Sequence, residues 1–219
     1  NTSLIFGHVW YSTRRYFVIR KFYNYYLSSD RQFARSIAGI VGFTPSNLHI
    51  FIQAFSHKSA VDPKLHTVTS NERLEYLGDS VLSTIVAEYL FQKYPNSDEG
   101  FLTKMRSKIV KRKTLNRIAD DMGIDVVLQE NNDTRLSESM KGNALEALVG
   151  AIYLEKGFDV TKRIVVNKIL RRHLNIQDLE EQDDNYKSQL LEFCQKNGSE
   201  IDYRVLERFK MENRDRFKI

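Results

Sequence analysis

Cysteine and proline are scarce in this chain, and each scarcity excludes a class of protein. One cysteine among 219 residues, Cys194, cannot form an internal disulfide or a cysteine-rich zinc site, which favours a reducing compartment and predicts a cytoplasmic protein. Only three prolines and ten glycines accompany long periodic apolar runs, which predicts a mostly helical fold. No run approaches the roughly 20 apolar residues of a membrane-spanning helix, so we expect no membrane segment.

Positive charge is in modest excess, with 33 lysines and arginines against 28 acids and a net charge of +5. Such a surplus suits a polyanionic partner, but it does not decide between nucleic acid, the ribosome and a membrane surface. Residues 1–29 contain no acid and many aromatic side chains. We interpret them as an N-terminal extension, either a plain helix with a solvated basic face or a contact for RNA or another partner.

The stretch NERLEYLGDSVL, residues 71–82, places acids at helical spacing. Glu72, Glu75 and Asp79 stand at i, i+3 and i+7, which brings them to one face of a helix while the leucines and valine fall mostly on the other. A capping box from Thr69 to Glu72 is expected to begin this helix. Three like charges on one face repel one another, so a positive group should lie opposite them.

A second stretch, KGNALEALVGAIYLE at residues 141–155, predicts a buried helix with one isolated acid. Glu146 is the only formal charge between the two ends, and Asn143 projects from the same face three residues earlier. Gly150 should permit close packing against a neighbouring helix. A carboxylate in such an apolar helix is costly unless it meets a cation, a metal or a proton.

These two helices together predict a site for a hard cation. Glu75, Asp79 and Glu146 would supply carboxylate oxygens, Asn143 an amide oxygen, and water the remaining ligands of an octahedral Mg²⁺. The alternative is structural, because a buried Glu146 could pair with an arginine such as Arg73. Spacing alone does not place the two helices side by side.

Two further patterns give expectations about local structure. Residues 102–121 predict one helix, whose many basic side chains we interpret as a solvated face. The turn over residues 42–46 should end one helix, with Pro45 suited to the start of the next and Ser46 able to cap it.

Four segments, in the same order and at familiar separations, resemble those of the ribonuclease III family, and the likeness covers roughly residues 30–172. In chain order they are AFSHKSA, NERLEYLGDSVL, DEGFLTKMRSKIV and GNALEALVGAIYLEKG. The resemblance implies an all-α endonuclease domain over residues 30–176 that forms a homodimer. It also implies Mg²⁺-dependent hydrolysis of double-stranded RNA, with Mn²⁺ as a substitute, in the processing of rRNA and mRNA. The products would carry 5′-phosphate and 3′-hydroxyl ends.

The resemblance assigns roles to individual residues. The metal-binding positions of the family fall on Glu75, Asp79, Asn143 and Glu146, with Asp79 and Glu146 also catalytic. Two more acids are implied in catalysis, Glu72 and, in the dimeric catalytic valley, Glu99. Most bacterial members carry Asp where this chain has Asn143, which removes a negative charge and should weaken Mg²⁺ binding. In the implied homodimer, the apolar face of the acidic helix, including Tyr76, would pack near the symmetry axis.

Residues 185–219, after a linker at 177–184, resemble the first helix and first strand of a double-stranded RNA-binding domain. The rest of such a domain is missing, so the module looks truncated. Gln189 and Glu192 lie where contacts of the first helix with RNA would be expected.

Two functions from different classes remain open on the sequence. One is a double-strand-specific endoribonuclease, which the five retained acids favour. The other is a catalytically silent relative that binds RNA, such as the ribonuclease III-like ribosomal proteins of mitochondria, which Asn143 and the basic N-terminus would suit.

Overall fold

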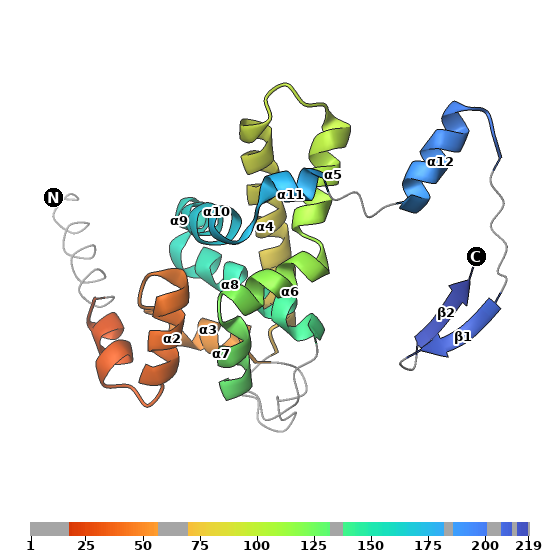
Figure 1. Ribbon diagram of the computed structural model, residues 1–219. Coiled ribbons are helices and arrows are strands. Elements are labelled where there is room, and N and C mark those ends of the chain that lie inside the picture. The colour runs from red at the N-terminus through yellow and green to blue at the C-terminus, as the bar shows by residue number, and fades with distance from the viewer. Residues whose placement is uncertain are drawn as a thin grey trace. The chain divides into compact units, whose positions relative to one another are not determined.

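A computed structural model describes residues 18–56, 70–131, 138–181, 186–200, 207–211 and 214–218. The chain divides into two compact units, residues 1–176 and 177–219 (Figure 1). In the described part of the first unit every regular element is helical, which confirms the all-α endonuclease domain. None of the described helices is both long and apolar enough to cross a membrane.

The helices of the first unit follow one another through short connections. A helix over residues 18–26 comes first. The others are α2 (Arg31–Val41), α3 (Leu48–Ala54), α4 (Glu72–Lys93), α5 (Glu99–Ile109), α6 (Arg112–Asp121), α7 (Ile124–Asn131), α8 (Glu138–Lys156), α9 (Phe158–Ile164), the π-helical η2 (Val165–Leu170) and α10 (Arg171–His173).

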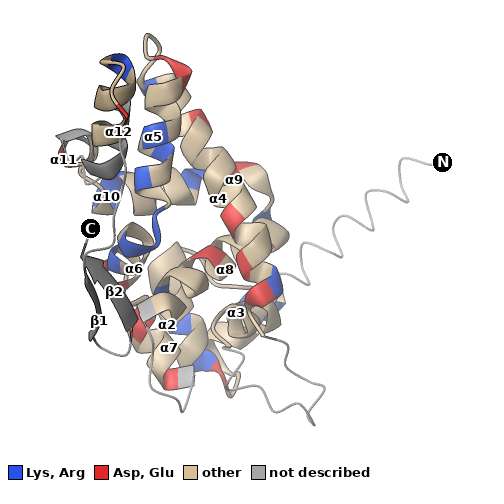
Figure 2. Ribbon diagram, turned by 90° about the vertical axis from the view of Figure 1, so that its right-hand side faces the viewer, with Lys and Arg blue, Asp and Glu red and all other residues tan. Residues whose placement is uncertain are grey.

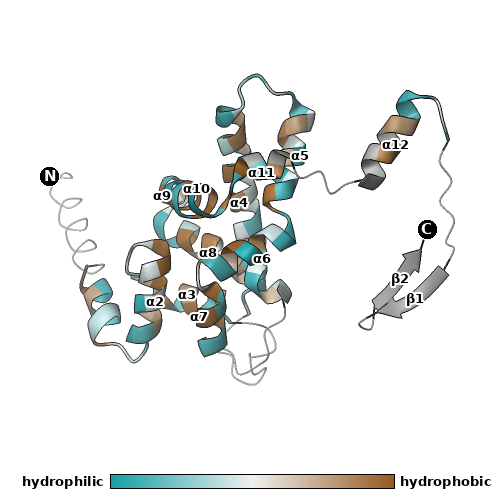
Figure 3. Cartoon of the chain, viewed as in Figure 1, coloured by the Kyte–Doolittle hydropathy of each residue, from teal (hydrophilic) through white to brown (hydrophobic). Residues whose placement is uncertain are grey.

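Helix α8 lies at the centre of this unit and packs most extensively against α4. Figure 3 shows hydrophobic positions on this helix, and its apolar residues from Ala144 to Ile152 are almost all buried. Helix α4 is amphipathic by contrast. It buries one stripe that includes Leu74, Leu82 and Ile85, and it exposes the opposite side. A hydrophobic central helix is therefore covered by the apolar stripes of its neighbours.

Two glycines set the spacing between α4 and α8. A β-carbon added at Gly78 would lie 1.7 Å from the carbonyl oxygen of Glu146, and one added at Gly150 would lie 2.4 Å from the carbonyl oxygen of Leu74. Any larger residue would force the two backbones apart. The predicted close approach at Gly150 is confirmed, and Gly78 is its counterpart on α4.

The single helix predicted over residues 102–121 is wrong, because the chain forms α5 and α6 with a break between them. Lys111 has φ −59° and ψ 134°, which is outside the helical region. The reason lies in the phase of the apolar residues. In an unbroken helix Leu115 would point about 120° away from Ile109, yet both are buried in the same unit. The break lets Leu115 of α6 turn toward the core as Ile109 of α5 does, and α6 begins at Arg112.

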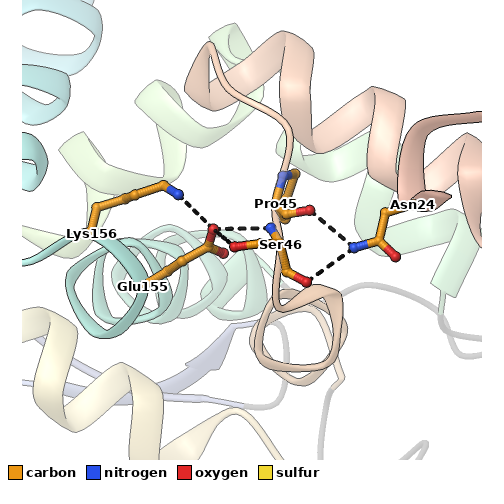
Figure 4. A network of polar contacts seen from close by, with 5 residues as sticks. All are labelled: Asn24, Pro45, Ser46, Glu155 and Lys156. Carbon is orange, nitrogen blue, oxygen red and sulfur yellow. Dashed lines mark hydrogen bonds and ion pairs between the residues drawn. The ribbon is translucent and has the colours of Figure 1, made fainter. Parts of the chain in front are cut away.

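A polar network fastens the C-terminal end of α8 to the turn before α3 (Figure 4). The carboxylate of Glu155 accepts hydrogen bonds from the backbone N–H of Ser46 at 3.0 Å and from its hydroxyl at 2.7 Å. Asn24 donates to the carbonyl oxygens of Pro45 and Ser46. The predicted capping role of Ser46 is wrong, because Asn47 is the N-cap residue of α3 and the Ser46 hydroxyl is committed to Glu155.

In the described residues from 176 onward, two helices precede a β-hairpin. Helix α11 (Ile176–Glu181) occupies most of the predicted linker, and α12 (Tyr186–Lys196) follows it. Strands β1 (Glu207–Met211) and β2 (Arg214–Lys218) are antiparallel, with Glu207 opposite Lys218 and Met211 opposite Arg214. The order of α12 and β1 matches the expected helix and strand, while the assignment to a double-stranded RNA-binding domain stays a prediction.

Candidate active site

The acids of the two predicted stretches meet where α4 crosses α8. Figure 2 shows acidic positions on both helices and basic positions on α5 and α6. Glu75 and Glu146 are half-buried, whereas Glu72 and Asp79 are exposed. Because Gly78 brings α4 against the backbone of Glu146, the acids of α4 lie near the Glu146 side chain.

The N-terminal end of α4 differs from its predicted start. Thr69, the expected capping residue, lies outside the described residues. Asn71 is the N-cap residue and makes no side-chain capping bond. Glu72, at the first helical position, accepts a hydrogen bond from the hydroxyl of Ser70 at 3.1 Å. Carboxylates in the first turn also gain from the helix dipole, so Glu72 and Glu75 suit this end of α4.

Burial and the charges of neighbouring carboxylates raise the pKa values of Glu75 and Glu146. Burial raises the pKa of Glu146 to about 7, and the charges of Asp79 and Glu75 add to the effect, while the charge of Arg112 opposes it. The pKa of Glu75 is also raised, chiefly by burial. The Glu146 carboxyl group resists ionisation first because it is partly buried and second because two other carboxylates are near it. The cluster therefore favours a bound cation.

Arg112 is the functional residue that sequence reasoning missed. Its guanidinium Nη1 donates a hydrogen bond of 2.7 Å to the side-chain oxygen of Asn143, and its charge lowers the pKa of both Glu75 and Glu146. It belonged to a run that we interpreted as a solvated face. The predicted alternative named Arg73 as the partner of Glu146, but the arginine whose charge acts on Glu146 is Arg112.

A small cavity of about 110 Å³ opens beside this cluster. It is bounded by the end of α5, the start of α6 and the first half of α8, which contribute Val110, Arg112, Leu115, Gly142, Asn143 and Glu146. The side-chain oxygen of Asn116 accepts a hydrogen bond of 3.0 Å from the N–H of Gly142 and so fixes α8 against α6. With liquid water taking about 30 Å³ per molecule, the cavity can hold several waters or a small oxyanion.

The donor atoms around the cavity fit a hard divalent cation. Carboxylate and amide oxygens are the ligands that Mg²⁺ and Mn²⁺ prefer. Glu146 and Asn143 line the cavity, and the charges of Glu75 and Asp79 act on Glu146. In the part of the chain that the structure describes, no three histidine, cysteine, aspartate or glutamate side chains converge into a ready-made metal cluster.

Glu99 is not brought to this cluster within one chain. It is the first residue of α5, its carboxylate accepts a hydrogen bond from Thr103 at 2.8 Å, and it lines another cavity of about 350 Å³ with Glu88 and Arg106. Glu88 is 13 residues beyond Glu75 on α4, which corresponds to about 20 Å along the helix. Glu99 and the cluster could therefore act together only on a long bound molecule, or if Glu99 lies near the cluster of a second chain in a dimer.

Tyr76 lies on a different face of α4 from the one predicted for the dimer axis. The apolar stripe of α4 is buried inside the chain itself, so it is not free to pack near a symmetry axis. Tyr76 is 79% exposed and shares its face with Ser80 and Thr84. Phe91, 70% exposed, follows about four turns later. The exposed face of α4 is therefore mostly small and polar, with an aromatic residue toward each end.

The RNA-contact residues predicted in the second unit, Gln189 and Glu192, both belong to α12. Their side chains lie outside what the structure describes, so their role stays a prediction.

Comparison with known proteins identifies the family of this chain. A family model described as Ribonuclease-III-like matches residues 47–173. Ribonuclease 3 of Zunongwangia profunda is 40% identical over 194 residues, which are 87% of this chain and 79% of that protein. Ribonuclease 3 of Bacteroides thetaiotaomicron is 38% identical over 82% of this chain, which spans 58% of that longer protein.

A solved structure agrees with these matches. The crystal structure of the nuclease domain of the Campylobacter jejuni ribonuclease III superposes with a TM-score of 0.54 and 34% sequence identity, covering 63% of this chain and 93% of that domain. The matched family segment, residues 47–173, contains all six predicted catalytic and metal-binding residues. This chain belongs to the ribonuclease III family.

Proposed function

We propose that this chain cleaves double-stranded RNA with a divalent cation held by Glu75, Asp79, Asn143 and Glu146. The endoribonuclease activity itself follows from membership of the family. The main support for this site is the environment of Glu146. Its carboxyl group lines a cavity near the acids of α4, and its pKa is raised to about 7. A cation there would relieve the repulsion and make the cavity attractive to a phosphodiester.

The charge of the substrate explains why the cluster needs a cation. A phosphodiester is an anion, and carboxylates alone would repel it. When bound, a divalent cation supplies an activated water and neutralises charge on the leaving 3′ oxygen. Glu75 and Asp79 would hold it from α4, and Asn143 and Glu146 from α8. We take the ion to be Mg²⁺, with Mn²⁺ as a substitute, because every proposed ligand atom is oxygen. The products are expected to carry 5′-phosphate and 3′-hydroxyl ends.

The proposed assembly is a homodimer formed through the exposed face of α4. A second solved structure of the Campylobacter jejuni nuclease domain is described as having structural flexibility in a region involved in dimer formation, and that domain is 35% identical with a TM-score of 0.55. In this chain Tyr76 is the most exposed large hydrophobic residue of the described part. A dimer would set two clusters along one duplex, with Glu72 and Glu99 beside the RNA, and cutting of both strands would leave short 3′ overhangs.

The silent RNA-binding alternative is not favoured. All five predicted carboxylates are present, and the matched curated relatives are named as ribonuclease 3 enzymes. We propose processing of rRNA and mRNA in the cytoplasm as the setting, with Gln189 and Glu192 of α12 contributing RNA contacts.

Cleavage of a long, perfectly paired RNA duplex tests the proposal. The chain should cut it with Mg²⁺ or Mn²⁺ and stop when a chelator is added. Glu146→Gln should lower the rate by at least about a hundredfold, because it removes the central acid of the cluster. Glu130→Gln on α7 is the matched control, since it removes an exposed acid outside the cavity. Equal cutting with and without chelator, or full activity of Glu146→Gln, would contradict the proposal.

A further inference from the structure

Arg112 is an exposed cation beside the acidic cluster, and the proposed function gives it no role. Its guanidinium lines the same cavity as Glu146 and Asn143 and lowers the pKa of two acids in the cluster. We propose that Arg112 is a catalytic residue whose guanidinium, held by Asn143, binds a non-bridging oxygen of the scissile phosphodiester. This inference rests on the proposed nuclease function.

The bonding of Arg112 leaves its charge available to a substrate. Its polar partners in the described part are the amide oxygen of Asn143 at 2.7 Å and the carbonyl oxygen of Ser139 at 3.5 Å. Neither partner is a carboxylate, so the guanidinium is positioned by neutral groups. The short bond to Asn143 uses one of the five N–H donors of an arginine, and the planar fork matches two oxygens of a phosphate.

The backbone explains how Arg112 reaches the cavity. The break at Lys111 makes Arg112 the first residue of α6, and Val110, Arg112 and Leu115 form one wall of the cavity. On the opposite side the contact of Asn116 with Gly142 fixes α8 against α6. The guanidinium, although exposed, is held by Asn143 where two helices meet. A donor that is already in place stabilises a developing charge with little cost of reorganisation.

The hydrogen bond to Arg112 offers a reason for asparagine rather than aspartate at position 143. An aspartate at position 143 would form an ion pair with Arg112 and neutralise it. The amide of asparagine accepts the same hydrogen bond but keeps the positive charge of Arg112 free. When the proposed ligands Glu75, Asp79 and Glu146 are all ionised they carry three negative charges. Arg112 offsets one of these, which leaves two for a divalent cation to balance. Arg112 would supply the second positive charge toward the phosphate, and it transfers no proton.

A set of arginine variants tests this role with two independent measurements. The first is kcat and KM for cleavage of a perfect RNA duplex in Mg²⁺. The second is the Kd of Mn²⁺, measured by calorimetry without RNA. Arg112→Gln should lower kcat by about a hundredfold to a thousandfold with a small change in KM, as loss of one charge-stabilising donor does. It should also tighten Mn²⁺ binding several-fold, because a cation in the cluster no longer faces a second positive charge.

Two further variants control for charge and for fold. Arg117→Gln removes the same charge from the same helix at an exposed position outside the cavity, and it should change neither kcat nor the Kd of Mn²⁺. Arg112→Lys keeps the charge but loses the fork, so it should retain part of the activity. Thermal unfolding of each variant shows whether a loss of activity is a loss of fold.

The results separate this inference from the proposed function. An active wild-type chain with an equally active Arg112→Gln overturns the role of Arg112 and leaves the nuclease intact. Weaker Mn²⁺ binding by Arg112→Gln also overturns it, because Arg112 would then only support Asn143. A wild-type chain that does not cut the duplex in either metal refutes the nuclease, and with it this role.

Discussion

A methyl group at Gly78 would lie 1.7 Å from the carbonyl oxygen of Glu146, far inside the distance that two such atoms tolerate. The clash would be with backbone, which cannot rotate away as a side chain can. Helices α4 and α8 can therefore approach this closely because position 78, like Gly150 on the other helix, has no side chain. The same contact sets the distance between the acids of α4 and Glu146, so a packing requirement and an electrostatic cluster depend on one residue.

Gly78→Ala should damage both stability and activity. Overpacking at a buried helix crossing should destabilise the chain by about 1–3 kcal/mol, and the displaced α8 should lower the cleavage rate at least about tenfold. Gly39→Ala is the control, because no atom lies within 4 Å of a β-carbon there and alanine favours the helix by up to about 1 kcal/mol. Urea unfolding and duplex cleavage measure the two effects. Equal stability of both variants would show that the helices can separate freely.

Periodicity predicted the acidic helix and the buried helix, because both have apolar residues at regular helical spacing. It also marked Glu146 as unusual, since an isolated charged residue within an apolar run is evident from the sequence. Periodicity does not reveal which two helices pack against each other. The match between Gly78 and Gly150 emerges only once α4 and α8 are packed together.

Arg112 was beyond prediction for a related reason. Its neighbours in sequence are basic, so nothing distinguished it from a solvated charge. Its role depends on the break at Lys111, and that break follows from the apolar phase between Ile109 and Leu115, which is decided by tertiary packing. Glu99 is the opposite case. The motif that contains it was recognisable in the sequence, but its position near the far end of α4, away from the cluster, was not.

Glu146 predicts an unusual pH dependence of stability in the metal-free chain. Its folded pKa of about 7 is above the ordinary value of 4.5, so the folded state binds more protons than the unfolded state between these values. Stability should therefore fall as pH rises from about 4.5 to 7 and then level off. Because the side chain is partly exposed and solvent screens it, the cost at pH 8 should be about 1–2 kcal/mol rather than the full value of the shift.

Glu146→Gln should remove this cost. In chelator, the variant should be more stable than the wild type at pH 8 and nearly equal to it at pH 4.5, as measured by urea unfolding. Glu130→Gln should follow the wild type at both values. A Glu146→Gln variant that is less stable at pH 8 would show that the ionised carboxylate is already balanced in the absence of metal.

A divalent cation bound among the carboxylates of the cluster should offset their repulsion and stabilise the fold. Mn²⁺ should raise the thermal midpoint of the wild type, and Glu146→Gln should lose most of this shift, because ligands that bind only the folded state stabilise it by mass action. Asn143→Asp should bind Mn²⁺ more tightly through its added carboxylate. A tenfold gain in affinity would add up to about 1.4 kcal/mol at saturating ion. A shift that is equal in all three proteins would place the cation elsewhere.

Tyr76 should be required for dimer formation. Tyr76→Glu puts a charge on the exposed face of α4, so it should produce monomers at concentrations where the wild type is dimeric in sedimentation. Val126→Glu on α7 is the control, since Val126 is also an exposed apolar residue. The Tyr76 variant should also lose most of its cutting of both strands. If it sediments as the wild type does, the exposed face of α4 is not the interface.

Glu155 should stabilise the chain in the opposite pH range from Glu146. Burial alone would raise its pKa, but the bonds from Lys156 and from the N–H and hydroxyl of Ser46 outweigh it, so the pKa of Glu155 is below its ordinary value. Its contribution is therefore present above the unfolded pKa near 4.5 and is lost as pH falls through the lower folded value.

Glu155→Gln tests this contribution together with Ser46→Ala. At pH 7 Glu155→Gln should cost about 1.5–3 kcal/mol, because charge-assisted hydrogen bonds to a buried carboxylate are lost. Ser46→Ala removes only the hydroxyl bond of 2.7 Å and should cost about 1 kcal/mol. The double variant should cost less than the sum, since both changes remove that bond. Strict additivity at pH 7, measured by urea unfolding, would show that Glu155 stabilises α8 without using Ser46.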